Sequence, residues 1–337
     1  MAVKPNVRLL GSHISHMAFL LVWRDSGVTQ EHGFDMTVHI TARDVPGQPF
    51  LTFPDRAPKL LDGTYDFLSG LHHEPYHYRA RGDKRFMYIA QAQNDWDDSI
   101  VATPEIKSPK DLEGKKVIAT SNAPCVYGNL RHSLELGGAD LSRIEFVTLT
   151  GRTGVSGRAE PLEMVLSGEA AAACVDPPFD LRGEKQGLHR LEVPAVPVIH
   201  NATMCANQEW VRENEDTTMA FLRSMVDAIH FFKTQPEKSC EIIERELAPL
   251  LRLKGPDEIQ HLWQRWAGLL SPKPYPHPLA VWNVYNLDVA HDPAVNWIGP
   301  FEIWNTSYLR AIDDSQYIDE LWGSAQAATN PPVNAAI

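Results

Sequence analysis

Residues 71–78, LHHEPYHY, carry three side chains at the spacing of a zinc-hydrolase motif. His73, Glu74 and His77 match H-E-x-x-H, in which two imidazoles on one helix face hold zinc and the glutamate activates its water. Pro75 lies inside the motif, where it has no N–H and its ring clashes with the preceding turn. A helix can therefore begin near Glu74 but cannot run through it, which leaves His73 beside the N-terminus. We predict that His73 and His77 share no zinc ion, and we expect neither a metal nor another cofactor.

Other histidines follow segments that are predicted to be strands. His13 and His16 stand three residues apart at a predicted helix start, and His72 and His73 follow a predicted strand at residues 65–68. Ligands of open α/β sheets bind outside the carboxyl ends of the strands, so these imidazoles are candidate acid/base groups. In an extended segment His72 and His73 would point in opposite directions. The candidate catalytic residues are His13, His16, His72, His73 and Glu74. The alternatives are a solvated His13, a His16 that caps its helix, and a Glu74 that only starts one.

A second set of residues could bind an anionic ligand. Arg152, in TGRTGVSGR, could clamp a carboxylate with two hydrogen bonds, although glycine-rich turns are also common on plain surfaces. Ser121 and Asn122 could offer hydroxyl and amide groups to an anion or could simply cap a helix. Asp176 precedes two prolines and could equally be a turn residue. The candidate ligand-binding residues are Ser69, Ser121, Asn122, Arg152, Asp176, Phe179 and His200.

Composition excludes several classes of protein. A chain of 337 residues with 43% hydrophobic residues can bury a full core and form two lobes. The formal net charge of −12, without a Lys/Arg run, argues against nucleic acid or an anionic membrane as partner. The four cysteines are widely spaced, with no C-x-x-C pair, which fits a reducing compartment and indicates neither a disulfide framework nor a zinc knuckle. A thiol nucleophile remains open.

The N-terminal apolar run predicts neither a signal peptide nor a membrane span. It extends over residues 17–23, follows two histidines, runs into Arg24 and Asp25, and has no small-residue cleavage site. No stretch approaches the roughly 18 apolar residues of a membrane helix. We expect a cytoplasmic protein, or a periplasmic one if a leader has been removed.

The pattern of segments indicates an α/β protein. Short strands are predicted at residues 6–12, in HGFDMTVHI and at residues 65–68, each separated from the next by a helical segment. SPKDLEGKKVIAT opens a second unit with the same alternation. From about residue 200 the chain is predicted to be helical, and its tryptophans are expected in the core. The apolar stripe that marks a buried helix face is Phe221, Leu222, Met225, Val226, Ile229 and Phe232.

Three phrases together resemble type 2 periplasmic-binding proteins: TQEHGFDMTVHI, SPKDLEGKKVIAT and EPLEMVLSGEAAAACVDPPF. The nearest group looks like the sulfonate and nitrate receptors and the thiamine-pyrimidine synthase relatives, which include 4,5-dihydroxyphthalate decarboxylase. The resemblance covers most of residues 6–235. The chain departs from the pattern at Ala172, where an aspartate is usual.

The resemblance implies two α/β lobes joined by two crossing strands, with a ligand cleft between them and a helical C-terminal extension. Residues 1–99 and 197–337 would form lobe 1, and residues 100–196 would form lobe 2. The crossings would lie near residues 94–103 and 196–206. This arrangement would collect the candidate histidines at the cleft.

The resemblance leaves three functional hypotheses. The first, which we favour over the others, is an enzyme, a non-oxidative decarboxylase or related lyase that acts on a small aromatic or heterocyclic carboxylate, with a histidine as proton donor. The second is a solute receptor for a small organic anion, with an ABC permease as partner. The third is a cytoplasmic ligand sensor. A thiamine-pyrimidine synthase is less favoured, because the family's cysteine-rich iron motif is not seen. Under each hypothesis the partner is a small organic acid, without nucleic acid or membrane insertion, and a homo-oligomer is compatible with the sequence.

Overall fold

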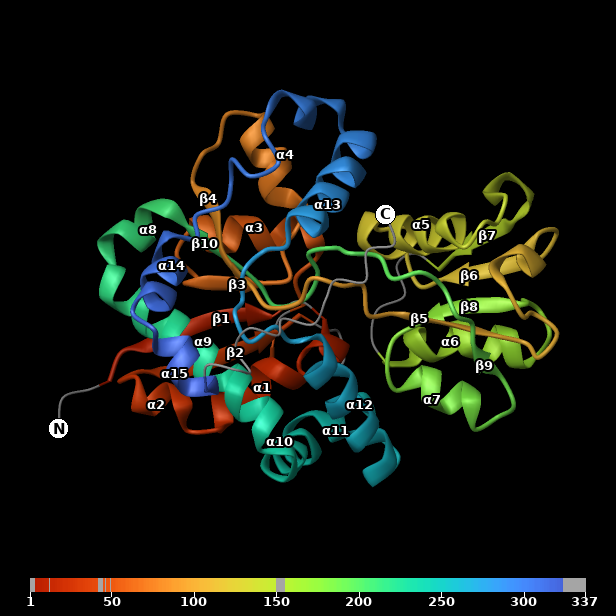
Figure 1. Cartoon of the computed structure of the whole chain (residues 1–337), viewed down its shortest axis with the longest axis horizontal. Coiled ribbons are helices and arrows are strands. Elements are labelled where there is room, and N and C mark those ends of the chain that lie inside the picture. The colour runs from red at the N-terminus through yellow and green to blue at the C-terminus, as the bar shows by residue number, and fades with distance from the viewer. Residues whose placement is uncertain are drawn as a thin grey trace.

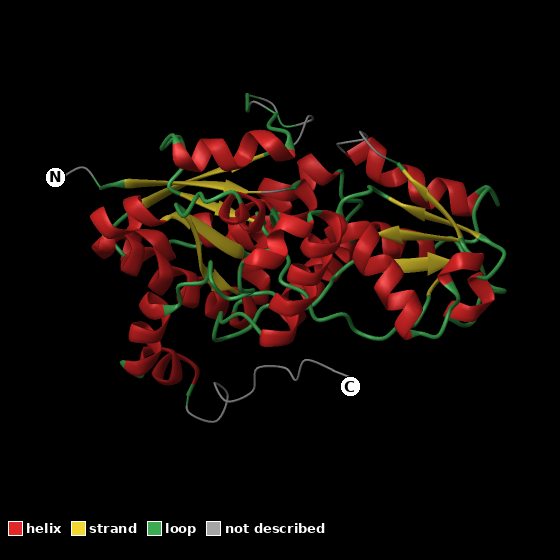
Figure 2. Cartoon of the chain, turned by 90° about the horizontal axis from the view of Figure 1, so that it is seen from above, coloured by secondary structure: helices red, strands yellow, loops and turns green. Residues whose placement is uncertain are grey.

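The computed structural model describes residues 4–11, 13–41, 45, 47–48, 50–149 and 155–323. Its strands form two five-stranded sheets with the orders β2-β1-β3-β10-β4 and β7-β6-β8-β5-β9. The sheets are the centres of two lobes that lie next to each other along the longest axis, each covered by helices (Figures 1 and 2). The chain is therefore an α/β protein of two lobes, as the sequence predicts.

The first sheet combines segments from both sides of the second lobe. Its strands are β1 (Asn6–Gly11), β2 (Asp35–Ile40), β3 (Phe67–Ser69), β4 (Phe86–Gln91) and β10 (Thr203–Asn207). Strand β1 pairs in parallel with β2 and β3, whereas β10 is antiparallel to β3 and β4. In β2 the residues Met36, Val38 and Ile40 are buried in alternation with polar ones, which is the pattern of a strand with one covered face.

The second sheet is built from shorter strands. They are β5 (Ser99–Ala102), β6 (Lys116–Ala119), β7 (Glu145–Thr148), β8 (Ala172–Val175) and β9 (His189–Arg190). Strand β6 is parallel to β7 and β8, and β5 is antiparallel to β8 and β9. All four residues of β8 are buried, so this small-residue strand forms the covered centre of the sheet.

Two segments of the chain cross between the sheets. The chain leaves the first sheet after β4 and enters the second with β5, and it returns between β9 and β10. The crossings run side by side, because Asp95 bridges to Pro197 and the Trp96 amide donates to the Val196 carbonyl over 3.0 Å. The loops at the carboxyl ends of the parallel strands are thereby held next to this double connection.

The helices fall into three groups. The first lobe has α1 (Ala18–Asp25), α2 (Val28–Glu31), α3 (Phe53–Leu61) and α4 (Glu74–Ala80), with the short helix η1 (Ile14–His16) before α1. The second lobe has η2 (Pro109–Leu112), η3 (Pro124–Gly128), α5 (Asn129–Leu136), η4 (Leu141–Arg143), α6 (Val155–Leu166) and α7 (Phe179–Glu184). The helical C-terminal part surrounds the first lobe in Figure 1. It consists of α8 (Gln208–Glu213), α9 (Glu215–Thr234), α10 (Pro236–Ile242), η5 (Ile243–Leu247), α11 (Ala248–Leu251), α12 (Pro256–Leu269), α13 (Pro278–His291), η6 (Pro293–Trp297), α14 (Ser307–Asp314) and α15 (Tyr317–Trp322). Within the described part of the chain, none of these helices combines the length and the hydropathy that a bilayer span requires.

Aromatic rings form the centre of the first lobe. The Phe221 ring of α9 stacks on Phe67 of β3 with centroids 3.8 Å apart, and Trp23 of α1 lies 4.7 Å from the same ring. The predicted stripe on α9 is confirmed, since each of its six residues is fully buried. The expectation that the tryptophans lie in the core is wrong for Trp297 and Trp282, which are 90% and 47% exposed.

The position of Phe221 predicts a large loss of stability on truncation. Phe221→Ala should lower the free energy of unfolding by about 3–5 kcal/mol, because it opens a cavity between a helix and a strand. The matched control Trp297→Ala removes a larger but exposed ring and should change that free energy by less than about 0.5 kcal/mol. Urea denaturation followed by circular dichroism measures both. Equal losses in the two variants would contradict the central role of the Phe221 ring.

Candidate functional site

Loops from both lobes bring imidazoles and one thiol together beside the crossing segments. His13 and His16 follow β1, and His72 and His73 follow β3. Cys125 lies in η3, which follows β6, and His200 lies on the return crossing ahead of β10. The structure therefore gathers five predicted site residues and one cysteine. We call this set the interlobe cluster: His13, His16, His72, His73, Cys125 and His200.

The imidazoles of the cluster form a connected row. The ring centroids are 5.9 Å apart for His13 and His16, 5.5 Å for His16 and His200, and 5.5 Å for His72 and His200. The rings of His72 and His73 lie 4.6 Å apart. The expectation that these two side chains point in opposite directions is wrong, because His73 has the helical angles φ −113° and ψ −50° instead of an extended backbone.

The two histidines of the H-E-x-x-H pattern converge on a carboxylate. Helix α4 begins at Glu74 with His73 at its N-cap position, as Pro75 predicts. His73 Nδ1 lies 2.8 Å from Asp288 Oδ1, and His77 Nε2 lies 3.3 Å from the same oxygen. Asp288 belongs to α13 and its side chain is fully buried. The imidazoles thus pair α4 with α13.

His200 is held by a buried carboxylate of the first crossing. Its Nδ1 lies 2.8 Å from Asp97 Oδ1, and both side chains are buried. Burial disfavours the protonated imidazole, but the attraction and hydrogen bond of Asp97 outweigh it and raise the pKa of His200 to about 10. The neighbouring Asp98 has no such partner, and burial together with the Asp97 charge raises its pKa to about 7.

Cys125 occupies the centre of this charged environment. The residue is 7% exposed. Burial alone would raise the pKa of the thiol, but the adjacent imidazoles of His200, His72 and His73 lower it well below its ordinary value.

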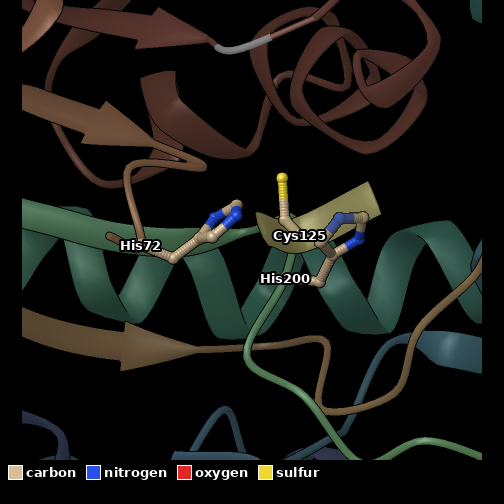
Figure 3. Close-up of side chains that lie close together, drawn as sticks. All are labelled: His72, Cys125 and His200. Carbon is tan, nitrogen blue, oxygen red and sulfur yellow. The ribbon is translucent and has the colours of Figure 1, made fainter. Parts of the chain in front are cut away.

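Burial lowers the pKa of His72 to about 4, so this ring is neutral. In the described part of the chain, His72, Cys125 and His200 form the group that could hold a metal ion, with donor atoms all within 4.8 Å of one another (Figure 3).

An arginine of the second lobe reaches a histidine of the first. Arg158 of α6 donates from Nε to His13 Nε2 over 3.1 Å and from its terminal nitrogen to Asp176 Oδ2. His13 Nδ1 lies 3.3 Å from Ser15 Oγ. Burial, followed by the nearby Arg158 charge, lowers the pKa of His13 well below its ordinary value. Arg158 thus donates to Nε2 of His13, while Nδ1 faces the Ser15 amide at 3.5 Å as well as the Ser15 hydroxyl.

The other predicted residues are less closely connected to the cluster. Ser69 is buried at the end of β3. Glu74 is next to His73, and burial raises the pKa of its carboxyl. Ser121 Oγ accepts a hydrogen bond from the Ala123 amide over 3.1 Å, which is the capping alternative, and Asn122 is exposed. Arg152 lies outside the described residues.

Phe179 has a structural position. Its ring is 1% exposed, it belongs to the apolar core, and the Arg182 guanidinium lies 4.9 Å above it. The side chain is therefore covered by protein at the start of α7, where its ring anchors the helix. Its contact with a ligand stays a prediction.

Sequence reasoning missed four residues that complete the site. Cys125 carried a usable signal, because it follows a predicted strand in the same way as the histidines do. Asp97, Arg158 and Asp288 carried none, since each contacts a histidine more than one hundred positions away. Only the fold reveals these partners.

Comparison with known proteins identifies the family to which the chain belongs. A family model described as NMT1/THI5 like matches residues 55–239, which is more than half of the chain. The chain belongs to the NMT1/THI5-like family. No curated protein resembles the sequence closely enough to count as a match.

Solved structures show the same fold as this NMT1/THI5-like chain. The periplasmic aliphatic sulphonate binding protein SsuA of Escherichia coli is 15% identical with a TM-score of 0.64, over 89% of this chain and 98% of that one. The periplasmic nitrate-binding protein NrtA of Synechocystis PCC 6803 is 13% identical with a TM-score of 0.65, over 99% and 93%. A DszB variant in complex with biphenyl-2-sulfinic acid is 11% identical with a TM-score of 0.60, over 93% and 100%. These likenesses confirm the predicted type 2 periplasmic-binding-protein fold.

The pairing of α4 with α13 should depend on pH through His77. Hydrogen bonding to Asp288 raises the pKa of this half-buried imidazole, and Asp292 adds to the rise. Asp292 also pairs with Arg81 at 2.7 Å, and the His291 ring lies 5.9 Å from the His77 ring. Because the folded pKa exceeds the unfolded value of about 6.5, the stabilisation is fully present below that pH and is lost as pH rises through the folded pKa.

We therefore predict that His77→Gln lowers the free energy of unfolding more at about pH 5.5 than at about pH 9.5. Urea denaturation at the two pH values measures the difference. The matched variant Asp292→Asn should remove part of the same pH dependence. A deficit in His77→Gln that is identical at both pH values would show that the ring acts only by packing.

Proposed function

We propose that the chain binds a small organic anion between its lobes, in the manner of a solute-binding protein. The observation that carries this proposal is the contact between Arg158 and His13, which joins the lobes through polar groups at the carboxyl ends of strands. Ligands of open α/β folds bind at such positions. The structural neighbours that bind sulphonate or nitrate support an anion as ligand.

The helix starts around the cluster support the same ligand class. Helices α1 and α5 each begin after a loop that supplies cluster residues, and α6 supplies Arg158. The N-terminal end of a helix carries partial positive charge and amide donors without intrahelical partners. An anion between the lobes would meet these donors together with the Arg158 guanidinium, whose side chain is 15% exposed.

Space for a small molecule lies beside the crossing segments. A cavity of about 420 Å³ is lined by residues that include Trp96, Asp98, Arg190 and Arg265. This volume falls in the lower part of the range of small-molecule sites, about 300–1,000 Å³. Arg265 also donates to the Asp97 backbone carbonyl over 2.6 Å, so the cavity lies next to the segment that holds His200, although no residue of the interlobe cluster is among its lining residues. Under this proposal an ABC permease is the protein partner.

Binding measurements test the proposal. Isothermal titration of nitrate, alkanesulfonates and aromatic carboxylates should identify an anion that binds, and Arg158→Gln should weaken it about 10- to 100-fold through loss of a charge-assisted hydrogen bond. The control Arg310→Gln removes an exposed arginine that pairs with Asp314 and should leave affinity unchanged. The proposal fails if no anion binds, or if Arg158→Gln binds as tightly as the wild type.

A second candidate function is a decarboxylase or related lyase that acts on a small aromatic or heterocyclic carboxylate. The row of imidazoles favours this candidate. An anion can be bound by cations and hydrogen-bond donors alone, whereas here four ring contacts bring five histidines together. Ser15 lies at Nδ1 of His13, and Nε2, which accepts from Arg158 here, is the nitrogen that would transfer a proton once a substrate takes the place of Arg158.

This candidate predicts turnover as well as binding. Wild-type protein should consume one aromatic carboxylate, and His13→Gln should keep measurable binding but lose about a hundred- to ten-thousand-fold in single-turnover rate. The control His132→Gln changes a histidine of α5 outside the cluster. If no carboxylate in a broad panel is consumed, the lyase is excluded and the binding function stands alone.

A further inference from the structure

Three side chains of the interlobe cluster direct possible metal-ligand atoms into one small region. Ring nitrogens of His72 and His200 and the Cys125 sulfur lie within 4.8 Å of one another. In Figure 3 the two rings lie on either side of the Cys125 side chain. The three residues come from the loop after β3, from η3 after β6 and from the return crossing. Separate elements of the fold thus converge on the same small volume.

His200 is oriented as metal-bound histidines are. Its Nδ1 faces Asp97 Oδ1 at 2.8 Å, and the Asn201 amide lies 3.1 Å from the same nitrogen. This leaves Nε2 as the donor atom toward the thiol. Histidine ligands of metals nearly always carry such a carboxylate or carbonyl on the other ring nitrogen, which fixes the tautomer and strengthens the donor.

His72 supplies an independent indication that a ligand is bound here. The residue is 6% exposed, and its Nδ1 is buried without a hydrogen-bond partner. Buried polar atoms of native proteins are almost always paired, and an unpaired one costs about 1–3 kcal/mol. An ion in the centre of the group would coordinate a ring nitrogen of His72, which at present has the Cys125 thiol as its neighbour.

We infer that His72, Cys125 and His200 bind one divalent ion of the zinc type. One thiolate and two imidazoles are a donor set that suits zinc, and hard ions such as Mg²⁺ or Ca²⁺ take oxygen ligands instead. Donors about 2.0–2.3 Å from a tetrahedral zinc stand about 3.3–3.6 Å apart. The donor atoms here lie within 4.8 Å of one another, so zinc binding requires them to approach by at most about 1.5 Å. Three protein ligands leave a fourth position open to an exogenous group.

The ion would also connect the two lobes. His72 belongs to the first lobe and Cys125 to the second, so one metal would hold the lobes in the arrangement seen here. His73 and His77 are not part of this donor set, because both imidazoles pair with Asp288, although the His73 ring lies next to His72 and Cys125. The inference does not rest on the proposed anion or on turnover.

Metal analysis of the full chain tests the inference. Protein is stripped with a chelator, dialysed against zinc and then against buffer, and its zinc is measured by plasma mass spectrometry. We expect about one zinc per chain in the wild type and in the control Cys240→Ser, which removes the half-buried thiol of α10. Cys125→Ser and His72→Gln should each bind zinc more than about 100-fold more weakly, since each loses a direct ligand.

Two further measurements separate lost ligation from lost folding. Cobalt(II) should give a thiolate-to-metal charge-transfer band in the wild type and in Cys240→Ser but not in Cys125→Ser, while circular dichroism shows whether each variant is folded. Asp97→Asn keeps all three ligands and should weaken zinc binding about 10- to 100-fold, because Asp97 positions His200. The inference is overturned if the wild type retains far less than one zinc, or if folded Cys125→Ser binds zinc and cobalt as the wild type does.

Discussion

The interlobe site depends on the placement of buried ionisable groups beside partners that lie far away in the sequence. An unpaired charge in a protein interior is strongly disfavoured, so each such group must find a counter-charge or become neutral. His200 has Asp97, His73 has Asp288, and Arg158 has Asp176. Each pair joins two different segments of the chain, so the charges of the site also help to fix its geometry.

This constraint explains why the histidines do not behave as their local sequence suggests. By their spacing alone His73 and His77 match a zinc-binding motif. In the fold, however, both imidazoles pair with the fully buried Asp288 carboxylate. The metal-capable group arises instead from residues with no common motif, because Cys125 is more than fifty positions from His72 and from His200. Residue spacing in the sequence can identify a site whose ligands all lie on one helix. The ligands proposed here lie on three separate segments of the chain.

Local patterns predicted individual elements, whereas the resemblance implied the two-lobed fold and its cleft. Alternating apolar residues predicted β2, the three- and four-residue spacing of α9 predicted its buried face, and Pro75 predicted where α4 begins. The strand ends placed His13, His16 and His72 at one edge of a sheet, and the crossing that the resemblance implies placed His200 near them. Contacts across the chain could not be predicted, since Asp288 is 215 positions from His73 and Arg158 is 145 from His13. Phe179 and Trp297 show the same limit, because burial depends on what other elements cover.

The insertion of β10 between β3 and β4 has a consequence for how the chain is made. A ribosome releases β1 to β4 first, yet β3 and β4 gain their shared neighbour only when residues 203–207 emerge, after the entire second lobe. Pairings of high sequence separation form slowly, and exposed strand edges invite association with other chains. The second lobe, with its five strands contained between residues 99 and 190, can complete its sheet before β10 of the first sheet has been synthesised. The first lobe, although its synthesis begins first, therefore completes its sheet after the second lobe does.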